Sequence, residues 1–124
     1  MSHVVSSSFS ISSAKFDAEF LKDRFPWPVV ESSAYPPSGK ADFYVTVFDL
    51  GVGEHKRTDK HLVAAKAAML QQESEFAALS DDCKYALWVT YRFSSKDGAI
   101  NINPSVSSAL GLLNVELIFH LQPK

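Results

Sequence analysis

The sequence has one cysteine, few glycines and no long apolar run. Cys83 is the only cysteine in 124 residues, so no intramolecular disulfide can form, as is usual for proteins of reducing compartments. No apolar stretch approaches the roughly 20 residues that span a bilayer. The first residues, 1–6, also lack the basic start and apolar centre of a secretory signal. These absences predict a cytoplasmic protein without a membrane partner.

An excess of charge of one sign is also missing. The formal net charge is −2, whereas a surface that binds nucleic acid usually has a clear basic excess. Hydrophobic residues make up 46% and charged residues 21% of the chain, which is a globular composition and argues against disorder. The length is close to the commonest domain size. We therefore expect a single domain over residues 1–124 and no nucleic-acid partner.

Sequence motifs for catalysis and cofactor binding are not evident. No serine lies in a Gly-x-Ser-x-Gly or Ser-x-x-Lys pattern. The segment 51–53, Gly-Val-Gly, lacks the third glycine and the acidic partner of a dinucleotide loop. Cys83 follows two aspartates, whose negative charges raise the pKa of a thiol and make it less nucleophilic. The chain is therefore expected to have no catalytic residues and no cofactor, and not to be an enzyme.

The histidines do not form a metal-ligand pattern. His55 and His61 are six residues apart across an expected loop-to-helix boundary, and no cysteine or acidic cluster completes a zinc ligand set. His120 lies in a C-terminal strand pattern, where a hydrogen-bonded surface or half-buried side chain is the expected state. The sequence therefore predicts no metal site.

The strongest structural signal is a strand pattern from Lys84 to Phe93. Its odd positions, from Tyr85 to Phe93, are all apolar or aromatic, which predicts a central strand with one face in the core. Trp88 and Arg92 lie on the opposite, mixed face.

Strand and helix patterns also fill the N-terminal half. Residues 4–11 alternate between apolar residues and serines, which predicts a strand. A short helix with Ser12 or Ser13 as its cap is expected to follow, and the prolines in residues 25–28 end it. A short strand starting at Val29 is expected to stop at a turn within residues 32–39, before a strand over 43–50.

The C-terminal half predicts one long helix, a hairpin and a strand-helix-strand unit. The long helix begins at Thr58 or Asp59, runs for five to six turns and ends at the turn 80–82. After the central strand, the turn 94–98 and a short antiparallel strand at 99–102 are expected. The remaining expected features are an Asn103-Pro104 helix start, a left-handed Asn114 and a strand over 115–121.

The predicted element order is β-α-β-β-α-β-β-α-β. Its first six elements match a split β-α-β, ferredoxin-like pattern. The fold class expected from this order is α+β, with a mainly antiparallel sheet of five to six strands and two or three helices on one face.

Surface residues that favour protein contact lie in four places. Trp27 and Tyr35 belong to a stiff, proline-rich connection and are either partner anchors or lids over the sheet. The basic segment at 54–57 and the acidic turn at 81–82 are loop candidates, although basic residues also keep helix faces soluble. The candidate partner-binding residues are Trp27, Tyr35, Glu54, His55, Lys56, Arg57, Asp81, Asp82, Trp88 and Arg92.

Residues 59–121 resemble a small bacterial family of domains of unknown function. The resemblance is carried by an amphipathic helix before an aromatic strand, then by segments 97–104, 109–113 and 115–118. The N-terminal half lacks the glycine-rich early segment expected in that family. Such proteins are often encoded beside polymorphic or secreted toxins, so the resemblance implies an immunity role. An immunity protein of this type binds a cognate toxin as a monomer or homodimer and blocks it sterically.

Two functions therefore remain open from the sequence. The first is an immunity-type inhibitor that binds a toxin and performs no chemistry. The alternative is a domain that binds a small molecule, or a minor enzyme, with a pocket between the sheet and the helices. The residues considered for that pocket are Tyr44, Tyr91, Arg92 and His120.

Overall fold

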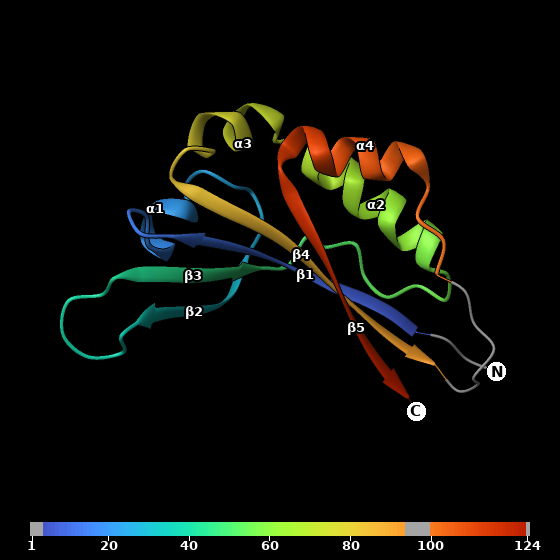
Figure 1. The fold of residues 1–124 in the computed structure, drawn as a ribbon, viewed down its shortest axis with the longest axis horizontal. Helices are drawn as coiled ribbons and strands as arrows, with labels where there is room; N and C mark the ends of the chain where they lie inside the picture. Colours follow the sequence, from blue (N-terminus) through green and yellow to red (C-terminus); the bar gives the residue numbers. More distant parts are fainter. Residues whose placement is uncertain (1–3, 94–99, 124) are drawn as a thin grey trace.

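The computed structural model describes residues 4–93 and 100–123 (Figure 1). Within these residues the chain forms five strands and four helices, an α+β fold. In chain order they are β1 (Val4–Ser13), α1 (Ala18–Leu21), β2 (Val29–Tyr35), β3 (Phe43–Phe48), α2 (Thr58–Leu70), α3 (Glu73–Leu79), β4 (Cys83–Phe93), α4 (Pro104–Leu113) and β5 (Val115–Pro123).

The strands form one mixed sheet in the order β2-β3-β1-β4-β5. The pairs β2–β3, β3–β1 and β1–β4 are antiparallel, as expected from the sequence. The pair β4–β5 is parallel, which corrects the prediction at that edge. The reason is the helix α4, which carries the chain back along the sheet, so that β5 runs in the same direction as β4.

The predicted strand at 99–102 is wrong for the residues that the structure describes. Residues 100–103 have no regular structure, while Ala99 and the predicted turn at 94–98 lie outside the described residues. The physical reason is that β4 has no free edge, because β1 pairs with one side of it and β5 with the other. A hairpin partner could not hydrogen-bond to it.

The single long helix predicted after Thr58 is two helices. Residues 71–72 form a turn between α2 and α3, in which the Gln72 N–H donates to the Met69 carbonyl at 2.9 Å. The turn redirects the chain so that Phe76 in α3 packs against Phe9 and Tyr85, with ring centroids 5.5 and 4.7 Å away. The aromatic contacts of α3 with the covered face of the sheet therefore favour a break in the helix at residues 71–72.

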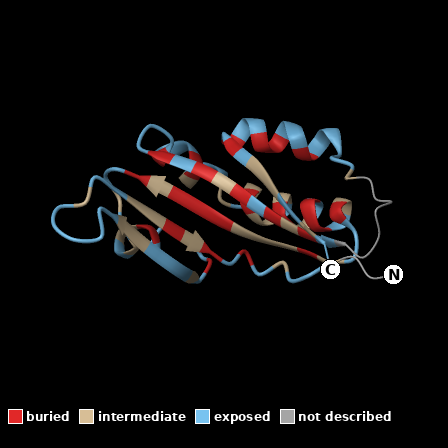
Figure 2. Ribbon diagram, turned by 60° about the horizontal axis from the view of Figure 1, so that its bottom comes forward, coloured by how far each residue is buried: buried red, intermediate tan, exposed pale blue. Residues whose placement is uncertain are grey.

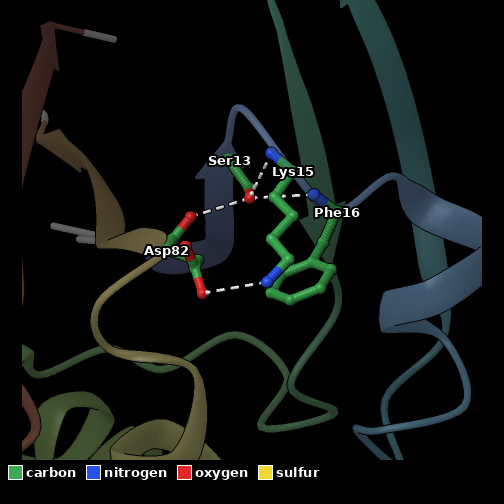
Figure 3. Close-up of polar contacts among 4 residues, drawn as sticks. All are labelled: Ser13, Lys15, Phe16 and Asp82. Atoms are coloured by element: carbon green, nitrogen blue, oxygen red, sulfur yellow. Dashed lines mark hydrogen bonds and ion pairs between the residues drawn. The ribbon is translucent and has the colours of Figure 1, made fainter.

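The predicted serine cap of the first helix is also corrected. β1 extends through Ser13, and the cap of α1 is Asp17, which accepts from the Phe20 N–H at 3.1 Å. Ser13 instead closes the turn between them: its Oγ accepts from the N–H groups of Lys15 and Phe16 and donates to the Asp82 carbonyl at 2.7 Å (Figure 3).

Other local predictions are confirmed. Asn103 caps α4 by accepting from the Ser105 N–H at 2.8 Å, with Pro104 in the first turn. Asn114 ends that helix in the left-handed conformation, with φ of 59°. β2 starts at Val29 as expected, but it continues to Tyr35 through part of the predicted turn, because β3 supplies a pairing partner.

The core lies between the sheet and the helices α2, α3 and α4, which cover one side of it (Figure 1). The odd positions of β4 from Tyr85 to Tyr91 are buried on this side, as predicted. An aromatic cluster fills the centre, with ring centroids 5.3 to 6.4 Å apart. Its members are Phe9, Phe25, Trp27, Phe48 and Phe76.

The other face of the sheet is uncovered within the described residues. Figure 2 looks at the sheet from below, and no helix is drawn across the strands. The four described helices also include none with the length and apolar character that a bilayer-crossing segment needs.

Candidate functional site

The uncovered sheet face carries three exposed aromatic side chains. Strand alternation places Tyr35, Phe43 and Trp88 on this face, together with Arg92. Trp88 is 44% exposed, and Tyr35 and Phe43 are exposed to a similar degree. Large aromatic side chains on an uncovered surface are the usual anchors of protein interfaces.

Trp88 is held in place rather than free to rotate. Its indole Nε1–H donates to the Oγ of Ser10 at 2.8 Å, and Ser10 is itself buried in the neighbouring strand. The hydrogen bond satisfies the only polar atom of the indole and fixes the ring against β1. Little rotational entropy then remains to be lost when a partner covers the ring.

The second aromatic group lies at another part of the same face. Tyr35 and Phe43 form a cross-strand pair whose rings stack with centroids 5.0 Å apart. Trp88 is opposite Ser8 in β1, whereas Phe43 lies one residue beyond the partner of Ser13. At about 3.3 Å per strand residue the two aromatic groups are roughly 20 Å apart.

The residues between the two aromatic groups are small. They are serines of β1 and valines of β3, which alternate onto the uncovered face: Ser10, Ser12, Val45 and Val47. A partner that covers this face would therefore contact short side chains in the middle, and larger aromatic side chains at Trp88 and at the Tyr35–Phe43 pair.

Of the other candidate residues in the strands and connections, Trp27 does not join this face, whereas Arg92 does. Trp27 is only 8% exposed and packs edge-on against Phe9 in the core, so it is a lid over the sheet and not a surface anchor. Arg92 lies on the uncovered face four residues along β4 from Trp88, and its Nε–H donates to Gln122 at 3.1 Å.

The two loop candidates lie at opposite ends of β1. The backbone of His55 pairs with Val5, next to the exposed Glu54, Lys56 and Arg57, whereas the Asp82 carbonyl accepts from Ser13. Eight residues of strand separate Val5 and Ser13, which corresponds to about 26 Å. The basic segment and the acidic turn therefore cannot belong to one compact site.

A hydrogen-bonded chain of three side chains lies near the start of α2. The Nδ1 atoms of His55 and His61 are 2.9 Å apart, and His61 Nε2 lies 2.6 Å from Ser7 Oγ. The sequence gives no local sign of this chain, because Ser7 is 54 residues from His61. His61 belongs to the first turn of α2 and is fully buried, and burial, followed by the charge of His55, lowers its pKa to about 4.

Ser7, His61 and His55 follow one another in the order found in nucleophilic sites, in which a serine is activated by a histidine that a third group orients. Catalysis needs a base that takes a proton near neutral pH and a substrate that reaches the hydroxyl. His61 is fully buried, and with a pKa of about 4 it does not take up a proton near neutral pH. The chain instead satisfies buried polar atoms and ties the start of α2 and the segment at His55 to β1.

Cys83 and the acidic turn border a hollow at the end of the sheet. The hollow has a volume of about 630 Å³, and Asp81, Asp82 and Lys84 line it with Cys83. Burial, and to a lesser extent the Asp82 charge, raise the pKa of the Cys83 thiol, as the sequence indicated. Among the described residues no group of three or more His, Cys, Asp and Glu side chains is placed to hold a metal ion.

A second hollow, of about 340 Å³, lies between α1 and the strands β2 and β3. Tyr44 lines it, whereas Tyr91 is buried in the core and His120 is exposed on edge strand β5. The structure thus brings only one of the residues considered for a small-molecule pocket to this hollow. Its other lining residues are Asp17, Ala18, Glu19, Ser32, Ser33, Ala34 and Thr46.

Comparison of the chain with known protein families, with curated proteins and with solved structures found no match.

Proposed function

We propose that this protein is an inhibitor-type binding domain that covers another protein with the uncovered face of its sheet. The observation that carries the proposal is the fixed, exposed indole of Trp88, whose Nε1–H is bonded to Ser10. An aromatic ring that is both exposed and pre-oriented is the typical centre of an energetic hot spot.

The separation of the aromatic groups favours a protein partner over a small molecule. A ligand that contacts both Trp88 and the Tyr35–Phe43 pair has to extend over roughly 20 Å of sheet. A standard protein interface, with about 800 Å² per partner, covers such a distance. Small molecules instead prefer concave sites that enclose most of their surface.

The resemblance of residues 59–121 to immunity-type proteins supports a toxin as the partner. The mechanism would then be steric: the domain lies over the active site or substrate groove of the toxin and excludes its substrate. The protein needs no reactive group for this, only an affinity high enough to keep the toxin occupied.

The test is to express the protein together with the product of the neighbouring gene, and to measure complex formation and relief of toxicity. Trp88→Ala is expected to weaken the complex about 30-fold, as the loss of a hot-spot residue does. Leu112→Ala is the matched control, because among the described residues Leu112 is the most exposed large apolar side chain, and it lies on α4, away from the uncovered sheet face. The proposal fails if no complex forms, or if Leu112→Ala weakens it as much as Trp88→Ala.

A further inference from the structure

The hollow between α1 and the strands β2 and β3 contains an unpaired buried hydroxyl. Thr46 in β3 is fully buried, and its Oγ1 has no hydrogen-bond partner among the described residues. The same side chain lines the hollow of about 340 Å³. Because a buried polar atom without a partner is costly, such a hydroxyl beside an open space is suited to bind a ligand.

The rim of this hollow is acidic. Asp17 uses Oδ1 to cap α1 and forms no ion pair with another described residue, so its other carboxylate oxygen is available. Glu19, two residues further on, also lines the hollow, although Lys22 lies 2.8 Å from its Oε2. Two carboxylates disfavour an anionic ligand and attract a cation.

The other lining groups add acceptors and an aromatic ring. Ser32 contributes a hydroxyl group from β2, because it pairs with Thr46 on the same face of the sheet, and Tyr44 contributes a half-buried phenol from β3. A hydroxyl accepts through two lone pairs, and an aromatic face attracts a cation. The hollow therefore combines carboxylates, hydroxyl acceptors and a ring around one small volume.

We propose that this hollow binds a guanidinium group. Guanidinium is planar and positively charged, and it carries five N–H donors and no acceptor, which complements a site made of acceptors. It also stacks on aromatic rings, whereas an ammonium ion is a compact and strongly hydrated point charge. The volume is at the lower end of the range for ligand pockets, which suits a guanidinium with a short alkyl chain.

The guanidinium can belong to an arginine side chain of a protein or to a free guanidino compound. The hollow lies on the helix-covered side of the sheet, because Thr46 pairs with Ile11, which is in the core. It is thus separate from the uncovered face that carries Trp88. The guanidinium site therefore does not depend on the inhibitor function.

The test is an NMR titration of the isotope-labelled full chain with methylguanidinium and, separately, with N-acetyl-arginine amide. Saturable shifts of the amide signals of Thr46, Asp17 and Tyr44 are expected with both probes. Tighter binding of the arginine derivative, by about tenfold, would identify a protein side chain as the source; equal affinities would identify a free guanidino compound. Equal shifts with tetramethylammonium, which has no N–H donor, or no saturable shift with either probe, would overturn the proposal.

Two variants separate recognition from folding. Thr46→Val removes the hydroxyl at nearly constant volume and is expected to weaken binding about tenfold, while Tm rises by a few degrees because the unpaired hydroxyl is gone. Asp17→Asn keeps the helix cap, since asparagine caps equally well, and is expected to weaken binding several-fold through the lost charge.

Thr90→Val is the matched control, because Thr90 lies on the opposite face of the sheet. It is expected to leave the affinity unchanged. If Thr46→Val binds methylguanidinium as tightly as the unchanged protein does, the ligand does not contact the Thr46 hydroxyl and the proposed site in this hollow is wrong.

Discussion

The imidazole rings of His55 and His61 face each other through their Nδ1 atoms, which are 2.9 Å apart. Only one hydrogen fits between two such atoms, so one ring donates and the other accepts. When the Nδ1–H of His61 donates to His55, the Ser7 hydroxyl donates to His61 Nε2. When His55 donates, the Nε2–H of His61 donates to the Ser7 oxygen at 2.6 Å. The pair is therefore stable with at most one positive charge.

This pair predicts a loss of stability in mild acid. The pKa of His61 is about 4 in the folded protein and about 6.5 in the unfolded chain, so the unfolded chain binds more protons between these values. The free energy of unfolding is expected to be highest above pH 6.5 and to fall by about 2 kcal/mol between pH 7 and 5. Urea unfolding at several pH values measures it. His61→Gln should show a flatter pH dependence, and an unchanged slope would contradict the prediction.

Removing the serine hydroxyl from the same chain should destabilise the fold at neutral pH. Ser7→Ala leaves the buried His61 Nε2 without its partner, which costs about 1 to 3 kcal/mol. Ser6→Ala is the control, since Ser6 is the adjacent residue on the uncovered face of the same strand. Equal stability of the two variants in chemical denaturation would show that the Ser7 contact is unimportant.

The hydroxyl of Tyr85 is predicted to stabilise the C-terminal end of α3. It donates to the Phe76 carbonyl at 3.0 Å inside the core, and burial raises the Tyr85 pKa far above its ordinary value, so the hydroxyl keeps its proton. Tyr85→Phe removes only this oxygen and is expected to cost about 1 to 2 kcal/mol of unfolding free energy. Tyr35→Phe, at an exposed position, should cost much less. A reversed order in thermal or urea unfolding would refute this role.

The two tryptophans are predicted to differ sharply in solvent access. Trp88 is 44% exposed on the uncovered face, whereas Trp27 is 8% exposed within the aromatic cluster. In a Trp27→Phe variant, acrylamide should quench the fluorescence of the remaining Trp88 efficiently. In Trp88→Phe, the remaining Trp27 should be protected and emit at shorter wavelength. Weak quenching of Trp88 would mean that the uncovered face is not accessible in solution, and strong quenching of Trp27 would mean that the aromatic cluster is not closed.

Local patterns were sufficient for several elements of the fold. The strand from Lys84 to Phe93 alternates apolar and mixed residues, and each buried position follows from that period. Asn103, Pro104 and Asn114 specify the two ends of α4 through capping chemistry within a few residues. Such features depend on neighbouring residues only, so the sequence predicts them directly.

The arrangement of the elements required contacts between distant residues. β4 has no edge for the predicted strand at 99–102 because β1, about 80 residues away, pairs with it. The predicted single helix breaks at residues 71–72, where Phe76 turns toward Phe9 on β1. Trp27, which the sequence left open as anchor or lid, lies in the core for the same kind of reason.

By itself the sequence determined the α+β class, the amphipathic strand at the sheet interior and the caps of α4, because local periodicity and the capping residues encode them. The tertiary structure decided which face of the sheet stays uncovered, since that depends on where α2, α3 and α4 pack. It also placed Ser7 beside His61, and it left the Thr46 hydroxyl unpaired within the described chain beside an acidic hollow. These sites form between residues far apart in sequence, so only the folded chain brings them together.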